Sequence, residues 1–170
     1  EKHSKIPVHE ITDDIQVEKD NLYIIPENKI VTAIDGALRL APLDDKRHKI
    51  KVIDLFFSSL AVVHQSFAVG VVLSGTLDDG TLGLQVIKAY GGITFSQDEA
   101  SAAFDGMPKN AISKGAVDFI MPPEKIAEHL LTINHFFPED YTKKEVAATT
   151  PKKDDEIFKQ LLTVLRVRRG

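Results

Sequence analysis

The hydrophobic and polar positions follow two different patterns, and the change between them falls near residue 51. Up to residue 41, short apolar runs alternate with polar residues and turn formers, as in DIQVEKDNLYIIPENKIVTAIDGALRLAP. Asp35-Gly36 favours a two-residue hairpin turn, and Pro26-Glu27-Asn28 interrupts an apolar run where a second turn is expected. This part of the chain therefore predicts β-hairpins.

After residue 51, helical and strand-like spacings alternate. The run FAVGVVLSG is short and continuous, as is typical of a strand buried on both faces of a parallel sheet. Strands are also expected at ITFSQ and AVDFIMP, and helices at residues 52–65, 81–90, about 107–114 and from Pro122-Pro123 to Pro138. Strands that alternate with helices indicate a parallel sheet with right-handed crossovers, so the pattern predicts an α/β fold.

The end of the chain has a different character. Residues 138–153, PEDYTKKEVAATTPKK, are polar and without a sustained period, so we expect a linker. Residues 154–170, DDEIFKQLLTVLRVRRG, begin with acids and end with arginines, the order that a helix dipole favours. Because one helix cannot form a core, this segment is expected to be the opening helix of a neighbouring domain.

Composition narrows the function classes. At 170 residues, 43% of them hydrophobic, the chain is long enough for one compact domain plus an appendage. Its 25 acidic and 21 basic residues give a net charge of −4, which disfavours nucleic acid and anionic lipid as partners. No apolar run approaches the ~18 residues of a membrane span, so a soluble protein is expected. The absence of cysteine excludes a thiol nucleophile and fits a reducing compartment.

Two adjacent acids, Asp78 and Asp79, stand just beyond the carboxyl end of the first predicted parallel strand, in LSGTLDDGTLGL. Open α/β sheets place ligands and catalytic groups at this end, where a carboxylate could orient a histidine, hold a metal or accept a phosphoryl group. The structural alternative is that one aspartate caps the helix beginning near Thr81 and the other is a solvated turn residue. The residue types alone favour this alternative.

Other motifs of catalysis and metal binding are absent from the sequence. Gly75 and Gly80 have the spacing of a phosphate-binding loop, but Thr81-Leu82 follows where Lys and Ser/Thr are required. No serine has the flanking glycines of a G-x-S-x-G nucleophile elbow. The histidines lack metal-site spacing, and we expect no metal site; they are His3, His9, His48, His64, His129 and His135.

A long segment carries several motifs in a fixed order. VVLSGTLDDGTLGLQVIKAYGGITFSQDEASAAFDGMPKNAISKGAVDFIMPPEKIA contains an S/T-G-x-x-x-D-G turn, a helix ending in Gly-Gly, and then Q-D-E, G-M-P and G-A-V-D. This set resembles the C-terminal half of the chemotaxis protein-glutamate methylesterase (CheB-type) domain. DNLYIIPENK and VIDLFFSSLA upstream match the same family's order of elements, so the resemblance covers residues 4 to 135.

The resemblance implies the C-terminal part of a doubly wound, mainly parallel sheet with helices on both faces, a β-hairpin insertion and a separate C-terminal helix. Residues 1–137 would be the methylesterase domain without its N-terminal strands. After the linker, 154–170 is similar to the first helix of a chemoreceptor methyltransferase (CheR-type) domain, as in hybrid methylesterase–methyltransferase proteins. S-adenosylmethionine would then bind entirely beyond this chain, in which no cofactor is expected.

The family hydrolyses glutamyl methyl esters with a serine, a histidine and an aspartate, and many members also deamidate glutamines. Its aspartate before glycine matches Asp79 rather than Asp78, which implies that Asp79 orients the histidine and stabilises the imidazolium. Thr76, with Gly75 and Gly80 in the same turn, matches the expected backbone N–H donor to the oxyanion. The stretch Gly106-Met107-Pro108 is expected near the substrate, although core packing explains Met107 about as well.

The family's serine lies in a G-x-S-x-G-G turn and its histidine follows a later strand, and both would fall upstream of Glu1. We therefore expect this chain alone to be inactive as an ester hydrolase. A sheet without its first strands would expose an edge and apolar surface, which predicts a homo-oligomer or a rearranged fold.

The leading hypothesis is therefore a cytoplasmic receptor methylesterase, with a methylated chemoreceptor and other chemotaxis signalling domains as its partners. The alternative is a non-catalytic interaction module that retains the esterase fold. A phospho-acceptor domain that uses Asp78 or Asp79 with magnesium ranks last, because no matching upstream acidic pair and no lysine late in the sheet accompany them.

Overall fold

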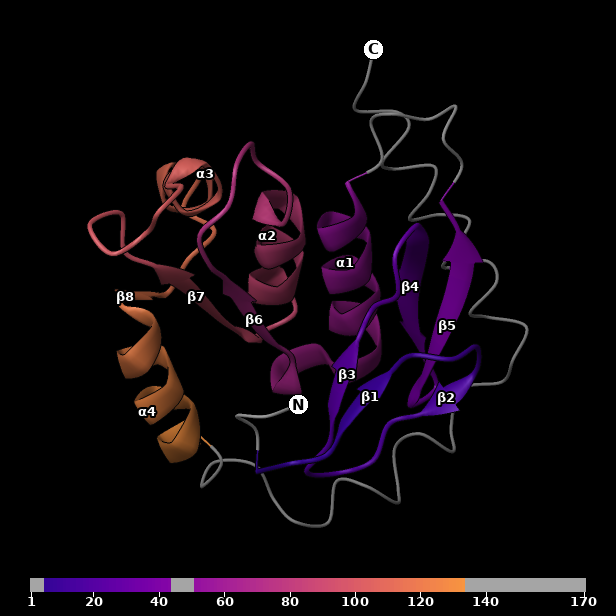
Figure 1. Cartoon of the computed structure of the whole chain (residues 1–170). Helices are drawn as coiled ribbons and strands as arrows, with labels where there is room; N and C mark the ends of the chain where they lie inside the picture. Colours follow the sequence, from indigo (N-terminus) through magenta and orange to yellow (C-terminus); the bar gives the residue numbers. More distant parts are fainter. Residues whose placement is uncertain (1–4, 44–50, 134–170) are drawn as a thin grey trace. The chain divides into compact units, whose positions relative to one another are not determined.

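The computed structural model describes residues 5–43 and 51–133 of the chain (Figure 1). Contacts divide the chain into two units, Glu1–Ile126 and Ala127–Gly170. The first unit contains all described elements except the end of the last helix, and it is the subject of the following paragraphs. The domain boundary predicted at residue 137, the linker 138–153 and the helix 154–170 lie outside the described residues.

Short strands form the N-terminal part of the first unit. Two of them, β1 (Val8–Glu10) and β3 (Leu22–Ile24), pair in parallel. An antiparallel sheet has the order β2-β5-β4 and consists of β2 (Ile15–Gln16), β4 (Lys29–Ile34) and β5 (Ala37–Pro42). The hairpin predicted at Asp35-Gly36 is confirmed, because these residues join β4 to β5 with φ of 49° and 77°, as a tight hairpin turn requires.

The prediction of hairpins throughout this part was wrong. The turn at Pro26-Glu27-Asn28 joins β3 to β4, but these two strands belong to different sheets. Instead, Leu22 of β3 lies opposite Val8 of β1. A turn signal locates a chain reversal, whereas packing against the rest of the molecule selects the strand partner.

A parallel sheet follows, in the order β6 (Val69–Val72), β7 (Ile93–Gln97), β8 (Phe119–Met121). The connection from β6 to β7 contains α2 (Thr81–Ala89), and that from β7 to β8 contains α3 (Gly106–Ser113). The predicted alternation of strands and helices is therefore confirmed, and with it the α/β class.

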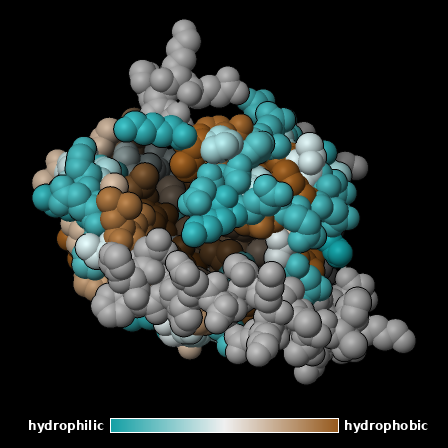
Figure 2. All heavy atoms as spheres, turned by 90° about the horizontal axis from the view of Figure 1, so that it is seen from below, coloured by the Kyte–Doolittle hydropathy of each residue, from teal (hydrophilic) through white to brown (hydrophobic). Residues whose placement is uncertain are grey.

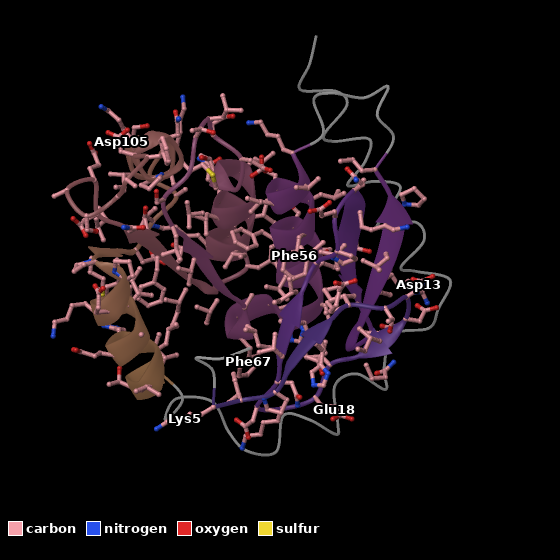
Figure 3. The ribbon with its side chains drawn as sticks, in the orientation of Figure 1. Lys5, Asp13, Glu18, Phe56, Phe67 and Asp105 are labelled. Atoms are coloured by element: carbon pink, nitrogen blue, oxygen red, sulfur yellow. The ribbon has the colours of Figure 1, made fainter. Side chains whose placement is uncertain are left out.

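Helix α1 (Val52–His64) packs against both parts of the unit and is followed by the short 3-10 helix η2 (Gln65–Phe67). On one side Phe56 packs, with Leu60 and Val63, on buried residues of the antiparallel sheet, as Figure 3 shows for Phe56. On the other side Phe57 packs on the buried cluster that contains Val72 of β6 and Leu84 of α2. This double packing fixes the start of α1 close to the end of β6.

The last described helix, α4 (Pro123–Ile133), begins at the predicted proline pair. Lys125 and Ile126 donate their N–H groups to the Pro122 carbonyl at 2.9 and 3.1 Å, the bonds of a first helical turn. The predicted continuation of this helix to Pro138 lies outside the described residues.

Several large apolar side chains of the described residues are exposed. They include Ile6, Val17, Leu22, Ile24 and Ile25 in the N-terminal part and Leu73, Leu77, Phe104, Phe119 and Ile120 in and around the parallel sheet. Figure 2 shows hydrophobic surface between polar residues on one face of the molecule. No helix within residues 5–43 and 51–133 has the length and hydrophobicity to cross a membrane.

Candidate active site

The turn between β6 and α2 lies at the carboxyl end of β6, where the α1 and α2 helices also begin (Figure 1). Leu77 in this turn has a φ of 68° and Gly80 a φ of 90°, so the backbone reverses sharply on both sides of the acidic pair. Gly80 is also enclosed, because a Cβ there would lie 3.0 Å from Ile53 Cγ2 and 3.1 Å from Val72 Cγ2. These constraints direct Asp79 toward the start of α1.

The carboxylate of Asp79 caps α1. Its Oδ2 atom accepts the N–H of Ile53 at 3.1 Å, and its Oδ1 atom accepts the N–H groups of Asp54 and Gly80, each at 2.9 Å. The first N–H groups of a helix have no partner inside the helix, and the positive end of the helix dipole favours an anion beside them. The N-terminus of α1 therefore orients an ionised Asp79.

The structural alternative, in which one of the two acids caps α2, therefore named the wrong helix. The N-cap of α2 is Gly80, which provides no side-chain cap, and Asp78 contributes only a backbone carbonyl that accepts the Thr81 N–H at 3.3 Å. Sequence proximity favoured α2, but the turn directs Asp79 across to α1, from which η2 and β6 separate it in the chain.

An ionised carboxylate offers about four acceptor positions. In Asp79 three are filled by backbone N–H groups, two on Oδ1 and one on Oδ2. Within the described parts of the chain, no donor occupies a second position on Oδ2. One further N–H, such as that of an imidazole ring, can therefore bind to an oxygen that is already fixed in place.

The neighbouring Asp78 has a different environment. Its Oδ2 atom accepts a hydrogen bond from Lys51 Nζ at 2.6 Å, and its side chain is 52% exposed. An exposed ion pair of this kind contributes little to stability. The interpretation of Asp78 as a turn residue fits this position.

Hydrogen bonds connect the turn to the loop that precedes α3. The Ser74 Oγ accepts the Phe104 N–H at 2.9 Å, and Gly75 both donates its N–H to the Phe104 carbonyl and accepts the Met107 N–H, each at 2.9 Å. Asn110 Nδ2 donates to the carbonyls of Leu77 and Gly106, both at 2.8 Å. Hydrogen bonds therefore hold the turn on the side of α3 as well as on the side of α1.

Gly75 and Gly106 permit this contact. A Cβ at Gly75 would clash with the Met107 sulfur, and one at Gly106 would lie 3.1 Å from the Leu77 nitrogen. Met107 packs on the buried cluster that contains Val72, and Pro108 is fully buried. Packing therefore accounts for Met107 and Pro108, and the expected proximity of Gly106-Met107-Pro108 to the substrate stays a prediction.

Thr76 lies at the exposed tip of the turn. Between the tied residues Gly75 and Leu77, its N–H has no hydrogen-bond partner among the described residues. A main-chain donor that is unpaired in a rigid turn is the geometry required of an oxyanion donor. Its role in catalysis stays a prediction.

No role was assigned from the sequence to three residues that build the site. Gln97, at the end of β7, is buried; its Oε1 accepts the Ser74 N–H at 2.8 Å and its Nε2 donates to Ser101 Oγ at 3.1 Å. Asn110 bridges the turn and α3, as described above. Asp54 is buried in the first turn of α1 and accepts the Gly83 N–H at 2.8 Å. Each acts through a long-range hydrogen bond, which spacing alone does not reveal.

Burial raises the pKa of the Asp54 carboxyl above its usual value. The Gly83 N–H and the Lys51 ammonium oppose this rise in pKa, while the negative charge of Asp79 adds to it. No group of three or more His, Cys, Asp or Glu side chains within residues 5–43 and 51–133 is arranged to hold a metal ion.

Comparison with known proteins assigns the family. The family model of CheB methylesterase matches residues 1–130. The chain belongs to the CheB methylesterase family. It is also similar to the crystal structure of the Thermotoga maritima CheB methylesterase catalytic domain, with a TM-score of 0.64 and 29% identity over 73% of this chain and 68% of that one.

Among curated sequences, a protein-glutamate methylesterase/protein-glutamine glutaminase of Burkholderia lata is 40% identical over 115 residues, 63% of this chain and 34% of the relative. An uncharacterised 104.1 kDa protein of Rhodobacter capsulatus is 42% identical over 125 residues, 74% of this chain and 13% of that protein. The chain thus spans about a third or less of the length of these two relatives.

Proposed function

We propose that this chain supplies the aspartate-bearing part of a protein-glutamate methylesterase, in which Asp79 orients the catalytic histidine. The observation that carries the proposal is the Asp79 carboxylate, which three backbone N–H groups fix at the carboxyl end of β6 while no donor among the described residues occupies the second position on Oδ2. Membership of the CheB family and the names of the curated relatives support the reaction class.

The sequence contains no G-x-S-x-G-G turn. We propose that the serine and, by the family resemblance, the histidine of this mechanism come from another segment of the enzyme. In the proposed reaction the histidine removes the serine proton as the serine oxygen attacks the ester carbonyl. Asp79 holds the imidazole in the required tautomer and stabilises the imidazolium that forms. The Thr76 N–H donates to the negative carbonyl oxygen of the tetrahedral intermediate.

The intermediate collapses with loss of methanol, which takes its proton from the imidazolium. Water, deprotonated by the same histidine, then hydrolyses the acyl-enzyme to a glutamate side chain and free serine. With a glutamine substrate the leaving group is ammonia instead of methanol, so the same residues would perform deamidation.

The proposed substrate is a methylated chemoreceptor or related signalling protein, and other chemotaxis signalling domains are the proposed further partners. A cysteine-free sequence is consistent with a reducing cytoplasm. We further propose that residues 154–170 begin a CheR-type domain, whose S-adenosylmethionine would bind beyond this chain.

A chimera tests the proposal. Residues 5–133 would replace the matching part of the Thermotoga maritima catalytic domain, and methanol release from methylated receptor would be measured. We expect activity in the chimera, a loss on the order of 10⁴-fold in Asp79→Asn because the histidine loses its orienting carboxylate, and little change in Asp78→Asn. The isolated chain should release no methanol.

Loss of activity in Asp78→Asn but not in Asp79→Asn would show that the triad aspartate is Asp78 and that the present assignment is wrong. A chimera that folds, as judged by its circular dichroism and thermal transition, but is inactive would favour the non-catalytic interaction module. Methanol release by the isolated chain would refute the proposed division of the catalytic residues.

A further inference from the structure

An acid beside the start of each of the helices α1 and α2 caps the start of the other helix. Asp79, which directly precedes the N-cap of α2, accepts the N–H groups of Ile53 and Asp54 in the first turn of α1. Asp54, in that first turn of α1, accepts through Oδ1 the N–H of Gly83 in the first turn of α2 at 2.8 Å. The two carboxylates thus exchange helix caps.

Neither helix has a side-chain cap of its own. The N-cap of α1 is Lys51 and that of α2 is Gly80, and neither provides a capping hydrogen bond from its side chain. Because unpaired N–H groups at a buried helix start are unfavourable, each start depends on the acid that comes from the other element.

The exchange requires a close approach of the two helices. A Cβ at Gly83 would lie 2.5 Å from Phe57 Cβ and 3.1 Å from Asp54 Cα. The missing side chain lets the Gly83 N–H reach the Asp54 carboxylate.

The burial of Asp54 is unfavourable in itself. The residue is 1% exposed, and within the described part of the chain its Oδ2 atom has no hydrogen-bond partner. The Lys51 Nζ lies 3.9 Å from this Oδ2 atom and also binds Asp78. A buried carboxylate with an open acceptor is destabilising unless its other contacts offset the loss of solvation. For Asp54 those contacts are the exchanged caps.

We propose that Asp54 is a positioning residue for Asp79. Its carboxylate holds α2 and its backbone N–H holds the Asp79 carboxylate, so that the two helix starts and the turn between them form one rigid junction. The proposal rests on the proposed function in one respect only, namely that Asp79 is the partner of a histidine. The coupling of the two carboxylates is a property of this chain alone.

Amide hydrogen exchange of the full chain, measured by NMR, tests the coupling. In Asp54→Ala the amides of Gly83 and of Ile53 should both exchange at least about fivefold faster, the factor expected for the loss of a helix cap. Exchange at the Ile53 amide accelerates only if the Asp79 carboxylate moves, because the Asp54 side chain makes no hydrogen bond to Ile53. Asp54→Asn keeps an acceptor for Gly83 and should restore both amides to within about twofold of the wild type.

A control is Asp13→Ala, which also removes a carboxylate-to-backbone bond, the exposed one of Asp13 Oδ1 to the Leu40 N–H at 3.1 Å. It should accelerate exchange at Leu40 and leave Ile53 and Gly83 unchanged. If Asp54→Ala accelerates only Gly83, or if Asp54→Asn folds but fails to restore Ile53, the positioning role is refuted.

A titration keeps the test decisive if Asp54→Ala does not fold. The carboxyl ¹³C signal of Asp54 should titrate at lower pH in Asp79→Asn than in the wild type, because the neighbouring negative charge has been removed. An unchanged midpoint would show that the two carboxylates are not close neighbours, which overturns the coupling.

The chimera separates this proposal from the proposed function. If the chimera is inactive but the exchange and titration results are as expected, the function fails and the coupling stands. If the chimera is active and its Asp54→Ala variant keeps wild-type kcat and KM, the coupling has no role in positioning Asp79 and the present proposal fails alone.

Discussion

Asp79 accepts the backbone N–H of Asp54 at 2.9 Å, although 25 positions separate the two residues in the chain. This bond joins the turn after β6 to the start of α1, and it places an ionised carboxylate where the carboxyl end of a parallel strand meets two helix N-termini. The same residue is thus a structural cap and the candidate partner of a histidine. Stability and activity measurements can separate these roles.

We expect Asp79→Ala to destabilise the chain by about 1–2 kcal/mol, because the N–H groups of Ile53 and Asp54 lose their cap. Asp78→Ala removes only an exposed ion pair with Lys51 and should cost less than about 1 kcal/mol. Urea unfolding at neutral pH measures both. Equal losses would show that Asp79 does not cap α1.

The raised pKa of Asp54 predicts a particular pH dependence. Its folded state binds the proton more tightly than the unfolded state, whose pKa is near the usual 3.8. Its contribution to stability is therefore complete below pH 3.8 and declines as the pH rises through the folded pKa. Relative to Asp54→Asn, the wild type should lose stability between pH 3.8 and neutrality, by about 1.4 kcal/mol for each unit by which the pKa is raised.

Urea unfolding of the wild type and Asp54→Asn in closely spaced steps from pH 3.5 to 7 measures this difference. Carboxylates that both proteins share, such as Asp118, cancel in the comparison. A difference in unfolding free energy that does not change with pH would contradict the raised pKa.

The sequence allowed the β6–α2–β7–α3–β8 order to be predicted because each element has its own period and its own stop signal, such as Gly91-Gly92 after α2. The strand partners in the N-terminal part could not be predicted from turns, because packing on α1 decides them. Asp79 was identified through a motif, whereas Asp54 and Asn110 act through hydrogen bonds that span 29 and 33 positions. Local patterns contain no information on such contacts.

Gly83→Ala gives a test in which two effects have opposite signs. Alanine stabilises a helix interior by about 1 kcal/mol relative to glycine. At this position, however, the new Cβ would lie 2.5 Å from Phe57 Cβ and 3.1 Å from Asp54 Cα. We expect the clash to prevail, with a net loss of roughly 1–3 kcal/mol in the free energy of unfolding. A more stable Gly83→Ala variant would show that α1 and α2 do not approach this closely.

The edge of the parallel sheet predicts self-association of the isolated chain. Strand β6 pairs with β7 on one side, and no strand among the described residues pairs with its other side. The strand is apolar throughout, as is typical of a strand with neighbours on both sides, and an open edge of this kind is a template for pairing with a second chain. Light scattering after size exclusion should therefore show a mass that rises with protein concentration.

A charge on this edge should oppose the association. Val71 is half-buried, so Val71→Lys can extend its ammonium toward solvent along the edge, whereas Val72 is buried and would not tolerate a charge. We expect Val71→Lys to remain a monomer at concentrations where the wild type associates. The exposed Lys109→Ala in α3 serves as the control and should associate like the wild type. If Val71→Lys folds and still associates, the contact lies on another surface, for which the exposed side chains Leu22 and Ile24 of β3 are the next to be substituted.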